Sequence, residues 1–177
     1  GRAPFNSILT HGFVVDGKGL KMSKSTGNII APEDILKKYG ADILRAWVAA
    51  SDYSEDLRLD HSILEQHAES YRKIRNTFRF LLANTNDLQY IVDVNELEDI
   101  DKWIVCVARD VCEEVNESFK NYDFSKGLSL VSNFMTNELS GVYLSFVKDR
   151  MYCDGANSTS RNSSASALAI VAKALLP

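Results

Sequence analysis

Apolar residues at helical spacing dominate the chain from about residue 60 onward. In three segments they recur every three or four positions, which places them on one face of an α-helix and leaves polar residues on the other. The three stripes are Ile63, His67, Tyr71, Ile74, Phe78 and Leu81; Leu97, Ile100, Ile104, Val107, Val111 and Val115; and Phe124, Leu128, Val131, Met135, Val142 and Phe146. Because such helices bury their apolar faces best against one another, the sequence predicts a helical bundle.

Polar segments separate these predicted helices. Residues 84–96 alternate polar and β-branched side chains, and we expect a loop there with room for one extended stretch. Residues 154–166 are rich in Ser, Asn and Gly. Helical spacing resumes afterwards, so we expect the last helix to begin at about Ala165.

The beginning of the chain has a different pattern. Residues 7–15 are apolar and β-branched and run into the turn sequence Asp16-Gly17-Lys18-Gly19, which predicts a strand entering a tight loop. Pro32 favours the first turn of a short helix, and Gly40 favours its end. Asp42 then opens a second short helix.

The predicted fold class is mainly α, with a short β and loop region followed by a helical bundle. We place the domain boundary where the long helices begin, which gives one part over residues 1–57 and a helical part over residues 58–177. Asp60 or Ser62 is suited to cap the first long helix, and Glu65 would complete a capping box with Ser62.

Composition and charge narrow the possible functions. The net charge of −4 and the isoelectric point near 5.4 exclude a generally basic surface, so any contact with nucleic acid must be local. The cysteines at 106, 112 and 153 form no CxxC pair and no cluster with histidine, so we expect no metal site and reduced thiols in the cytoplasm. The chain also shows no membrane span and no signal sequence. It begins without Met and stops directly after a helical pattern, so we expect a piece of a larger protein.

The segment Lys21-Met22-Ser23-Lys24-Ser25 carries the clearest chemical signal. Two lysines flank small hydroxyl residues in a loop that continues to Gly27, which combines cationic groups, hydroxyl donors and accessible backbone N–H groups. Such a set suits a polyphosphate, although it contains no Walker-type GxxxxGK[ST] pattern. Ser23, Ser25 and the N–H group of Gly27 are candidates for phosphate contacts, and shaping the loop is an equal alternative for each.

This loop and its surroundings resemble the end of the catalytic domain in class I aminoacyl-tRNA synthetases. Further segments are similar to the bacterial-type isoleucyl members, namely Thr10–Asp16, Gly40–Arg45, Tyr71–Thr77 and Lys148–Arg150. The resemblance covers most of residues 3–153. It implies that the first part closes a catalytic domain and that the helical part begins an anticodon-binding domain. The chain departs from the family pattern at Leu20, Thr26 and Ala46.

The resemblance implies a role for each residue of the motif. In that family the loop closes over the triphosphate of ATP while the aminoacyl-adenylate forms, and its second lysine makes the main catalytic contact. That role would fall on Lys24, with Lys21 in support. ATP binding would involve Lys21, Met22, Ser23, Lys24 and Ser25. The chemistry is reasonable, because negative charge builds on the departing pyrophosphate and lysines placed there stabilise the transition state most.

The resemblance also implies substrates and partners. The larger protein would use ATP with Mg²⁺ and tRNA(Ile), and isoleucine would be bound by parts absent from this chain, so this chain alone is expected to be inactive. A zinc site is possible elsewhere in the larger protein, which we expect to be a cytoplasmic monomer. Three alternatives remain: a valyl- or leucyl-tRNA synthetase, a non-catalytic synthetase-like RNA-binding module, and a helical interaction domain without nucleotide or RNA. The presence of both lysines favours the ligase.

A second candidate site lies on the first long helix. Arg72, Arg75 and Arg79 follow at i, i+3 and i+7, which places three guanidinium groups on one face, away from the apolar stripe. We expect this face to contact tRNA phosphates, or to be neutralised by acidic side chains such as Glu69 and Asp87. Aromatic residues that can stack on unpaired bases, or alternatively pack in the core, are Trp103, Tyr122, Tyr143 and Tyr152.

Overall fold

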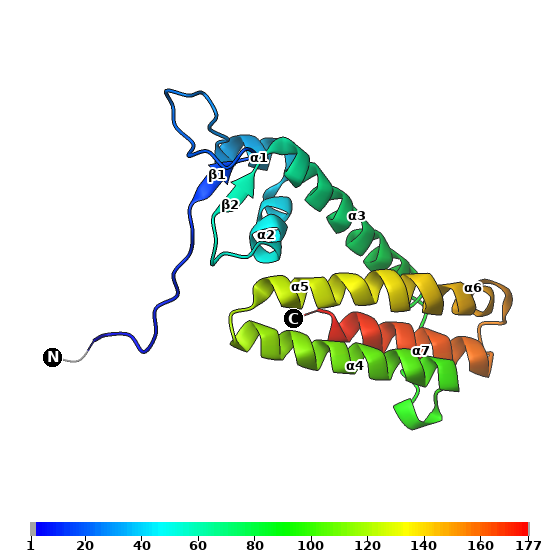
Figure 1. The fold of residues 1–177 in the computed structure, drawn as a ribbon. Helices are drawn as coiled ribbons and strands as arrows, with labels where there is room; N and C mark the ends of the chain where they lie inside the picture. Colours follow the sequence, from blue (N-terminus) through cyan, green and yellow to red (C-terminus); the bar gives the residue numbers. More distant parts are fainter. Residues whose placement is uncertain (1–2, 177) are drawn as a thin grey trace. The chain divides into compact units, whose positions relative to one another are not determined.

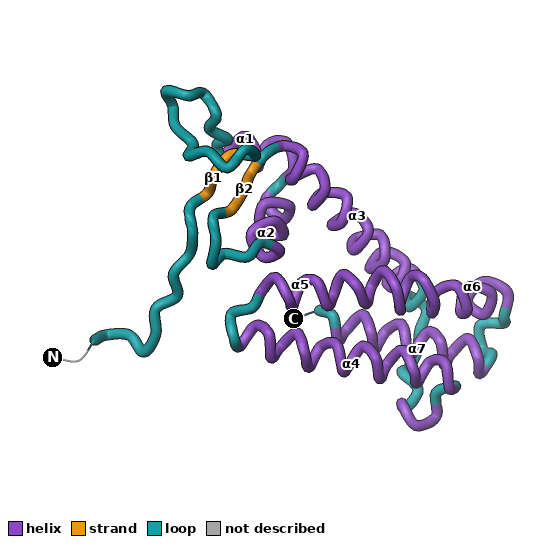
Figure 2. Tube along the Cα trace, viewed as in Figure 1, coloured by secondary structure: helices purple, strands orange, loops and turns teal. Residues whose placement is uncertain are grey.

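The computed structural model describes residues 3–176, which form two compact units, one ending at Glu69 and the next starting at Ser70. The fold is mainly helical, as predicted (Figures 1 and 2). Each unit has a hydrophobic core of its own. The long helix α3 (His61–Ala83) supplies residues to both units. The predicted domain boundary after residue 57 stays a prediction.

The first unit joins a short sheet to two short helices. Strand β1 (Val14–Asp16) pairs in parallel with β2 (Leu57–Leu59), and α1 (Pro32–Tyr39) and α2 (Ala41–Ala50) lie in the connection between them. A connection of this length is what parallel pairing requires. Its main hydrophobic cluster contains the buried residues Ile35, Trp47, Leu59 and Leu64.

The predicted strand over residues 7–15 is wrong for most of its length. Residues 7–13 are in no strand, and Phe13 is 80% exposed. A strand needs a neighbour for its backbone groups, and within residues 7–16 only 14–16 pair with another strand. Just before them, the N–H of Gly12 donates to the carbonyl of Tyr53 at 2.9 Å.

The predicted helix ends of the first unit are confirmed. Pro32 begins α1, and Gly40 ends it with a φ of 86°, which a residue without a Cβ adopts readily. Asp60 precedes α3, and its Oδ1 accepts the N–H of Ile63 at 2.8 Å. The alternative cap at Ser62, with its capping box, is wrong, because Ser62 lies inside α3 and its hydroxyl donates to Asp60 at 2.7 Å.

The second unit is a bundle of helices. It contains the later part of α3 and the following elements: η1 (Val94–Glu96), α4 (Asp99–Lys120), α5 (Phe124–Asn133), the π-helical segment η2 (Phe134–Tyr143), α6 (Leu144–Cys153) and α7 (Thr159–Ala174). Helix α4 packs against α5 and α7, and α7 packs against α6 (Figure 1). Residues 84–96 contain no strand, only the short 3₁₀ turn of η1.

The last helix begins earlier than predicted. It starts at Thr159 rather than near Ala165, and the hydroxyl of Ser158 accepts the N–H of Arg161 at 3.4 Å as its cap. Three of the serines that suggested a loop, Ser163, Ser164 and Ser166, are buried inside the helix. Ser163 donates to Asp101 at 2.6 Å, and the hydroxyl of Ser166 accepts the N–H of Val92 at 2.9 Å. Small polar residues are tolerated there because partners in neighbouring segments satisfy them.

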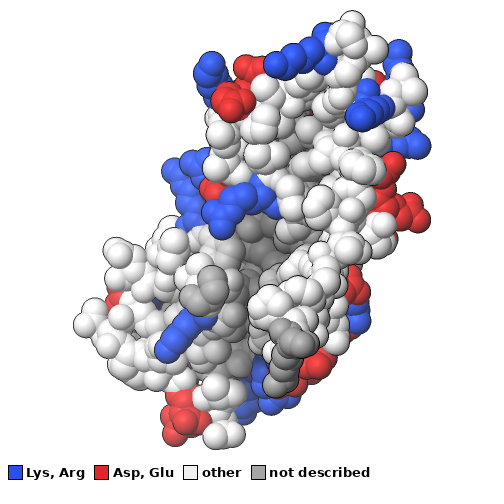
Figure 3. Space-filling view, turned by 90° about the vertical axis from the view of Figure 1, so that its left-hand side faces the viewer, with Lys and Arg blue, Asp and Glu red and all other residues white. Residues whose placement is uncertain are grey.

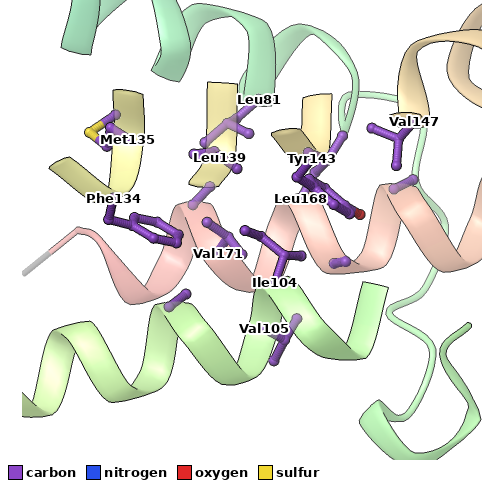
Figure 4. Packing of buried hydrophobic residues seen from close by; sticks show 14 of the residues in the cluster. Leu81, Ile104, Val105, Phe134, Met135, Leu139, Tyr143, Val147, Leu168 and Val171 are labelled. Carbon is purple, nitrogen blue, oxygen red and sulfur yellow. The ribbon is translucent and has the colours of Figure 1, made fainter. Parts of the chain in front are cut away.

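The third predicted apolar stripe is correct only as far as Met135. Val142 and Phe146 are 42% and 64% exposed. The buried core residues instead recur every four positions, and several of them converge in Figure 4. They are Met135, Leu139, Tyr143, Val147 and Met151. In an α-helix a step of four residues drifts by about 40°. The wider turns of η2 offset this drift, so the later residues face the core.

A buried carboxylate ties the bundle together. Asp101 of α4 is fully buried, and it accepts hydrogen bonds from the hydroxyls of Tyr143 at 2.5 Å, Ser163 at 2.6 Å and Ser164 at 3.1 Å. Arg150 approaches the same carboxylate at 3.5 Å and forms an ion pair with Glu98 at 2.8 Å. These partners come from η2, α6 and α7. Burial, together with the charge of Asp101, raises the pKa of the Tyr143 hydroxyl well above its usual range.

We predict that Tyr143→Phe lowers the free energy of unfolding by about 1.5–3 kcal/mol, because it removes a hydrogen bond to a buried charge and keeps the ring packing. Urea unfolding followed by circular dichroism measures this difference. Tyr152→Phe is the control, since Tyr152 is 63% exposed and its change should be small. Equal stabilities for the two variants would show that the network does not hold the bundle.

Candidate functional site

The Lys21–Ser25 motif lies in a loop that begins where β1 ends. The chain turns back at once: the N–H of Asp16 donates to the carbonyl of Leu20, and the N–H of Gly19 donates to the carbonyl of Asp16, both at 2.9 Å. Lys21 then forms an isolated antiparallel bridge with Val15. At Gly17 a Cβ would lie 2.2 Å from a carboxylate oxygen of Asp60, so a larger residue would have to displace the side chain that caps α3.

The side chain of Asp16 fixes this turn. Its Oδ1 accepts the N–H groups of Lys18 at 3.0 Å and Leu20 at 2.8 Å, and its Oδ2 accepts the side-chain amide of Asn28 at 2.9 Å. The hydrogen bond from Asn28 is the main reason that the pKa of Asp16 is lowered, followed by the bond from Leu20. The carboxylate therefore remains ionised at neutral pH and holds the beginning of the loop to its end.

The side chain of Asn28 closes the loop from the other end. Its amide nitrogen donates to Asp16 and, at 3.3 Å, to the carbonyl of Lys21. Its Oδ1 accepts the N–H of Ser23 at 2.9 Å and the hydroxyl of Thr26 at 2.7 Å. Each amide atom faces a partner of the opposite hydrogen-bonding type, so one side chain ties together four positions of the loop.

The hydroxyl groups of the loop bind one another. The Oγ of Ser23 lies 3.0 Å from the Oγ of Ser25 and 2.7 Å from the Oγ1 of Thr26, and it also accepts the N–H of Thr26 at 3.3 Å. Of the two roles open to Ser23 and Ser25, the hydrogen bonds in this structure match loop shaping. Thr26, a departure from the family pattern, takes part in the same network.

Within the described residues, the side chains of the two lysines of the motif form none of these hydrogen bonds. Lys21 and Lys24 are exposed, and neither forms an ion pair with a carboxylate within the described part of the chain. Met22 between them is half-buried and packs against the core of the first unit, so it anchors the loop. A surface hollow of about 780 Å³ adjoins the loop, lined by Asp16, Gly17, Lys18, Leu20, Lys21, Thr26, Asn28 and Asp60.

The arginine face of α3 is exposed to solvent. Arg72, Arg75 and Arg79 are all exposed, and no carboxylate of residues 3–176 forms a salt bridge with Arg75 or Arg79. Asp87, an expected partner, instead pairs with Arg161 at 2.7 Å. On the face that Figure 3 shows, lysine and arginine side chains form several separate groups with acidic side chains among them.

The aromatic candidates for base stacking divide into two groups. Tyr143 is fully buried and bound to Asp101, so a stacking role for it is wrong. Trp103, Tyr122 and Tyr152 are 39%, 48% and 63% exposed. These three remain candidates for contact with a base.

Nowhere in residues 3–176 do three or more His, Cys, Asp or Glu side chains gather in a way that suits a metal ion. Within the same range, every helix is too short or too polar to cross a bilayer.

Comparison with known proteins places this geometry in a family. Residues 1–60 match the model of class I tRNA synthetases (I, L, M and V), and residues 101–177 match the anticodon-binding domain of tRNA ligases. Isoleucine–tRNA ligases of Wolinella succinogenes and Nitratiruptor sp. are 58% and 57% identical over 98% and 99% of the chain. The chain belongs to the class I tRNA synthetases. It spans 19% of the length of each of these relatives.

A solved structure of the same class supports the fold assignment. The chain is similar to the leucyl-tRNA synthetase of Agrobacterium radiobacter K84 (agnB2), solved as a ternary complex with tRNA and LeuAMS. The TM-score is 0.70 and the identity 17%, over 91% of this chain and 20% of that one. At this identity the likeness supports the class I synthetase fold alone.

Asp16, Thr26 and Asn28 were not predicted as functional residues from the sequence. Each contributes through hydrogen bonds to positions between two and twelve residues away. The available signal was the Asp-Gly turn before the motif and the Gly-Asn pair after it, both typical of ordered turns. These residues position the class I synthetase loop and leave its lysines accessible.

We predict that Asn28→Ala speeds amide hydrogen exchange at Ser23 by about tenfold, as loss of one hydrogen bond of about 1.4 kcal/mol would. NMR or mass spectrometry at residue resolution measures this rate. The N–H of Leu57, bonded to the carbonyl of Phe13 at 2.8 Å, serves as the internal control. If exchange at Ser23 is unchanged, Asn28 does not order the loop.

Proposed function

We propose that this chain forms part of a cytoplasmic isoleucine–tRNA ligase, which activates isoleucine with ATP and transfers it to tRNA(Ile). The observation that carries the proposal is a loop with a fixed base and two exposed lysines, in a chain 58% identical to an isoleucine–tRNA ligase. The chain itself supplies the loop that binds the phosphates of ATP and helices that contact tRNA. Isoleucine is bound elsewhere in the ligase.

The chemistry at the loop is stabilisation of charge during adenylate formation. A carboxylate oxygen of isoleucine attacks the α-phosphorus of ATP, the bond to the β-phosphate oxygen breaks, and pyrophosphate leaves as its Mg²⁺ complex. Negative charge grows on the leaving group, so the ammonium groups of Lys24 and Lys21 bind the transition state more strongly than the ground state. The absence of ion pairs at either lysine supports this role, because no internal carboxylate among the described residues competes with the phosphates.

The fixed base of the loop supports the same role. Asp16 and Asn28 hold its two ends together, so the backbone that carries the two lysines is fixed. Their ammonium groups stay free to move. Positioning of this kind lowers the entropy lost when the loop closes on the triphosphate.

We predict that Lys24→Ala in the intact ligase slows isoleucine-dependent exchange of pyrophosphate into ATP by about 10²-fold or more, which corresponds to about 3 kcal/mol. Lys21→Ala should slow it less, because this lysine has the supporting role. Lys37→Ala on α1 is the matched control, an exposed lysine outside the loop. An unchanged exchange rate in Lys24→Ala would show that Lys24 makes no catalytic contact, whereas no exchange by the unmodified ligase would favour the alternative, a non-catalytic RNA-binding module.

We also propose that the arginine face of α3, Arg72, Arg75 and Arg79, binds phosphates of tRNA(Ile). The exposure of all three and the lack of salt bridges at Arg75 and Arg79 within the described residues support this role. Phosphate contacts of this kind position the nucleic acid and carry no direct sequence information. Selection of the correct tRNA must then depend on other parts of the ligase.

We predict that Arg75→Ala and Arg79→Ala each weaken tRNA binding and reduce the slope of log affinity against log salt concentration by about one unit or less. Nitrocellulose filter binding of the intact ligase across a salt series measures both quantities. Arg109→Ala is the control, since Arg109 already pairs with Asp110 at 3.0 Å and Glu113 at 3.9 Å. Unchanged slopes with lowered thermal stability would assign these arginines a structural role.

A further inference from the structure

A second polar hollow lies in the helical unit, between α3 and the π-helical segment η2. Its volume is about 330 Å³. It is lined by five hydroxyl residues, one amide, one lysine and two apolar residues: Ser70, Thr77, Ser132, Thr136, Ser140, Asn76, Lys73, Ile74 and Met135. Among residues 3–176, no carboxylate lines it, although acidic residues outnumber basic ones in this chain. The hollow therefore favours a polar ligand with negative charge.

The walls of this hollow are ordered by their own hydrogen bonds. The hydroxyls of Thr77 and Ser140 lie 3.2 Å apart and join α3 to η2, and Thr77 also donates to the carbonyl of Lys73 at 3.0 Å. The buried Met135 and the half-buried Ile74 form its apolar floor. Thr136 and Asn76 are exposed at its edge. Segments of π-helix are rare and frequently lie at functional sites, which agrees with a binding role.

The hollow and the arginine face lie on different sides of α3. Ser70, Lys73 and Thr77 follow at i, i+3 and i+7, so they share one side of the helix. At about 100° per residue, Arg75 and Arg79 point to roughly the opposite side. The hollow is therefore separate from the proposed phosphate contacts of that face.

We propose that this hollow binds one ribose-phosphate unit of an RNA backbone, with Lys73 on the phosphate and the hydroxyls of η2 on the 2′-hydroxyl. The inference rests on the proposed function and adds a specific subsite to it. A lysine ammonium group binds phosphate as a point charge. Serine and threonine hydroxyls both donate and accept, as a ribose 2′-hydroxyl does, so a ribose can form hydrogen bonds here that a deoxyribose cannot.

The test compares RNA with DNA in the intact ligase. Binding of a tRNA(Ile) transcript and of a DNA copy of the same sequence is measured by fluorescence anisotropy across a salt series. Lys73→Ala should weaken binding of both by about 3- to 10-fold and reduce the salt slope by about one unit. Thr136→Val, which replaces a hydroxyl by a methyl group of similar size, should weaken binding of the transcript alone. The RNA-to-DNA affinity ratio should then fall.

The control variant is Lys120→Ala, which removes an exposed lysine already paired with Glu117 at 3.1 Å and should leave both affinities unchanged. If Lys73→Ala behaves like Lys120→Ala, the subsite is wrong. If Lys73→Ala weakens binding while Thr136→Val leaves the affinity ratio unchanged, the contact with ribose is wrong. Isoleucine-dependent pyrophosphate exchange by the unmodified ligase is measured in parallel. Its absence, or the absence of transcript binding by the unmodified ligase, would refute the proposed function instead.

Discussion

The carboxylate of Asp101 is the constraint on which the helical unit depends. A buried charge is tolerated only where hydrogen bonds and opposite charges satisfy it. Here Tyr143, Ser163, Ser164 and Arg150 meet this need, and they come from η2, α6 and α7. Displacement of any one of these elements would leave the carboxylate under-satisfied. The polar network therefore selects one arrangement of helices that apolar packing alone would select less sharply.

A carboxylate with several hydrogen bonds also organises the first unit, where it orders a loop. Asp16 also gathers hydrogen bonds from residues apart in the chain, but near the surface and around a loop rather than inside a bundle. Together with Asn28 it fixes the base of the loop, and the lysines remain unpaired among the described residues. A fixed base with free cationic groups suits a ligand that arrives and leaves in every catalytic cycle. In this short segment Asp16 and Asn28 form the fixed base, and Lys21 and Lys24 remain accessible.

Sequence patterns predicted most of the helices, because amphipathic spacing and the Pro and Gly signals at helix ends act locally. They did not predict the register of the third helix. The sequence contains two apolar patterns after Met135. Val142 and Phe146 continue the spacing of an ordinary α-helix. Leu139 and Tyr143 continue a spacing of four residues, and these two are buried in the core. The choice depends on contacts with α4 and α7, and on a π-helical segment that spacing does not indicate. The early start of α7 was missed for a related reason, since its serines are satisfied by Asp101 and Val92, far away in the chain.

The distribution of ion pairs explains how an acidic chain presents cationic sites. Many carboxylates of the helical unit already have basic partners: Asp87 with Arg161, Glu98 with Arg150, Asp110 and Glu113 with Arg109, Glu114 with Lys126, and Glu117 with Lys120. The exposed ones among these pairs contribute little stability, typically less than about 1 kcal/mol each. They do, however, cancel charge locally. Lys21 and Lys24 on the loop, and Arg75 and Arg79 on α3, have no such partner among the described residues, so positive potential remains where phosphates are proposed to bind. Local pairing, and not the net charge of −4, thus determines which surfaces attract a polyanion.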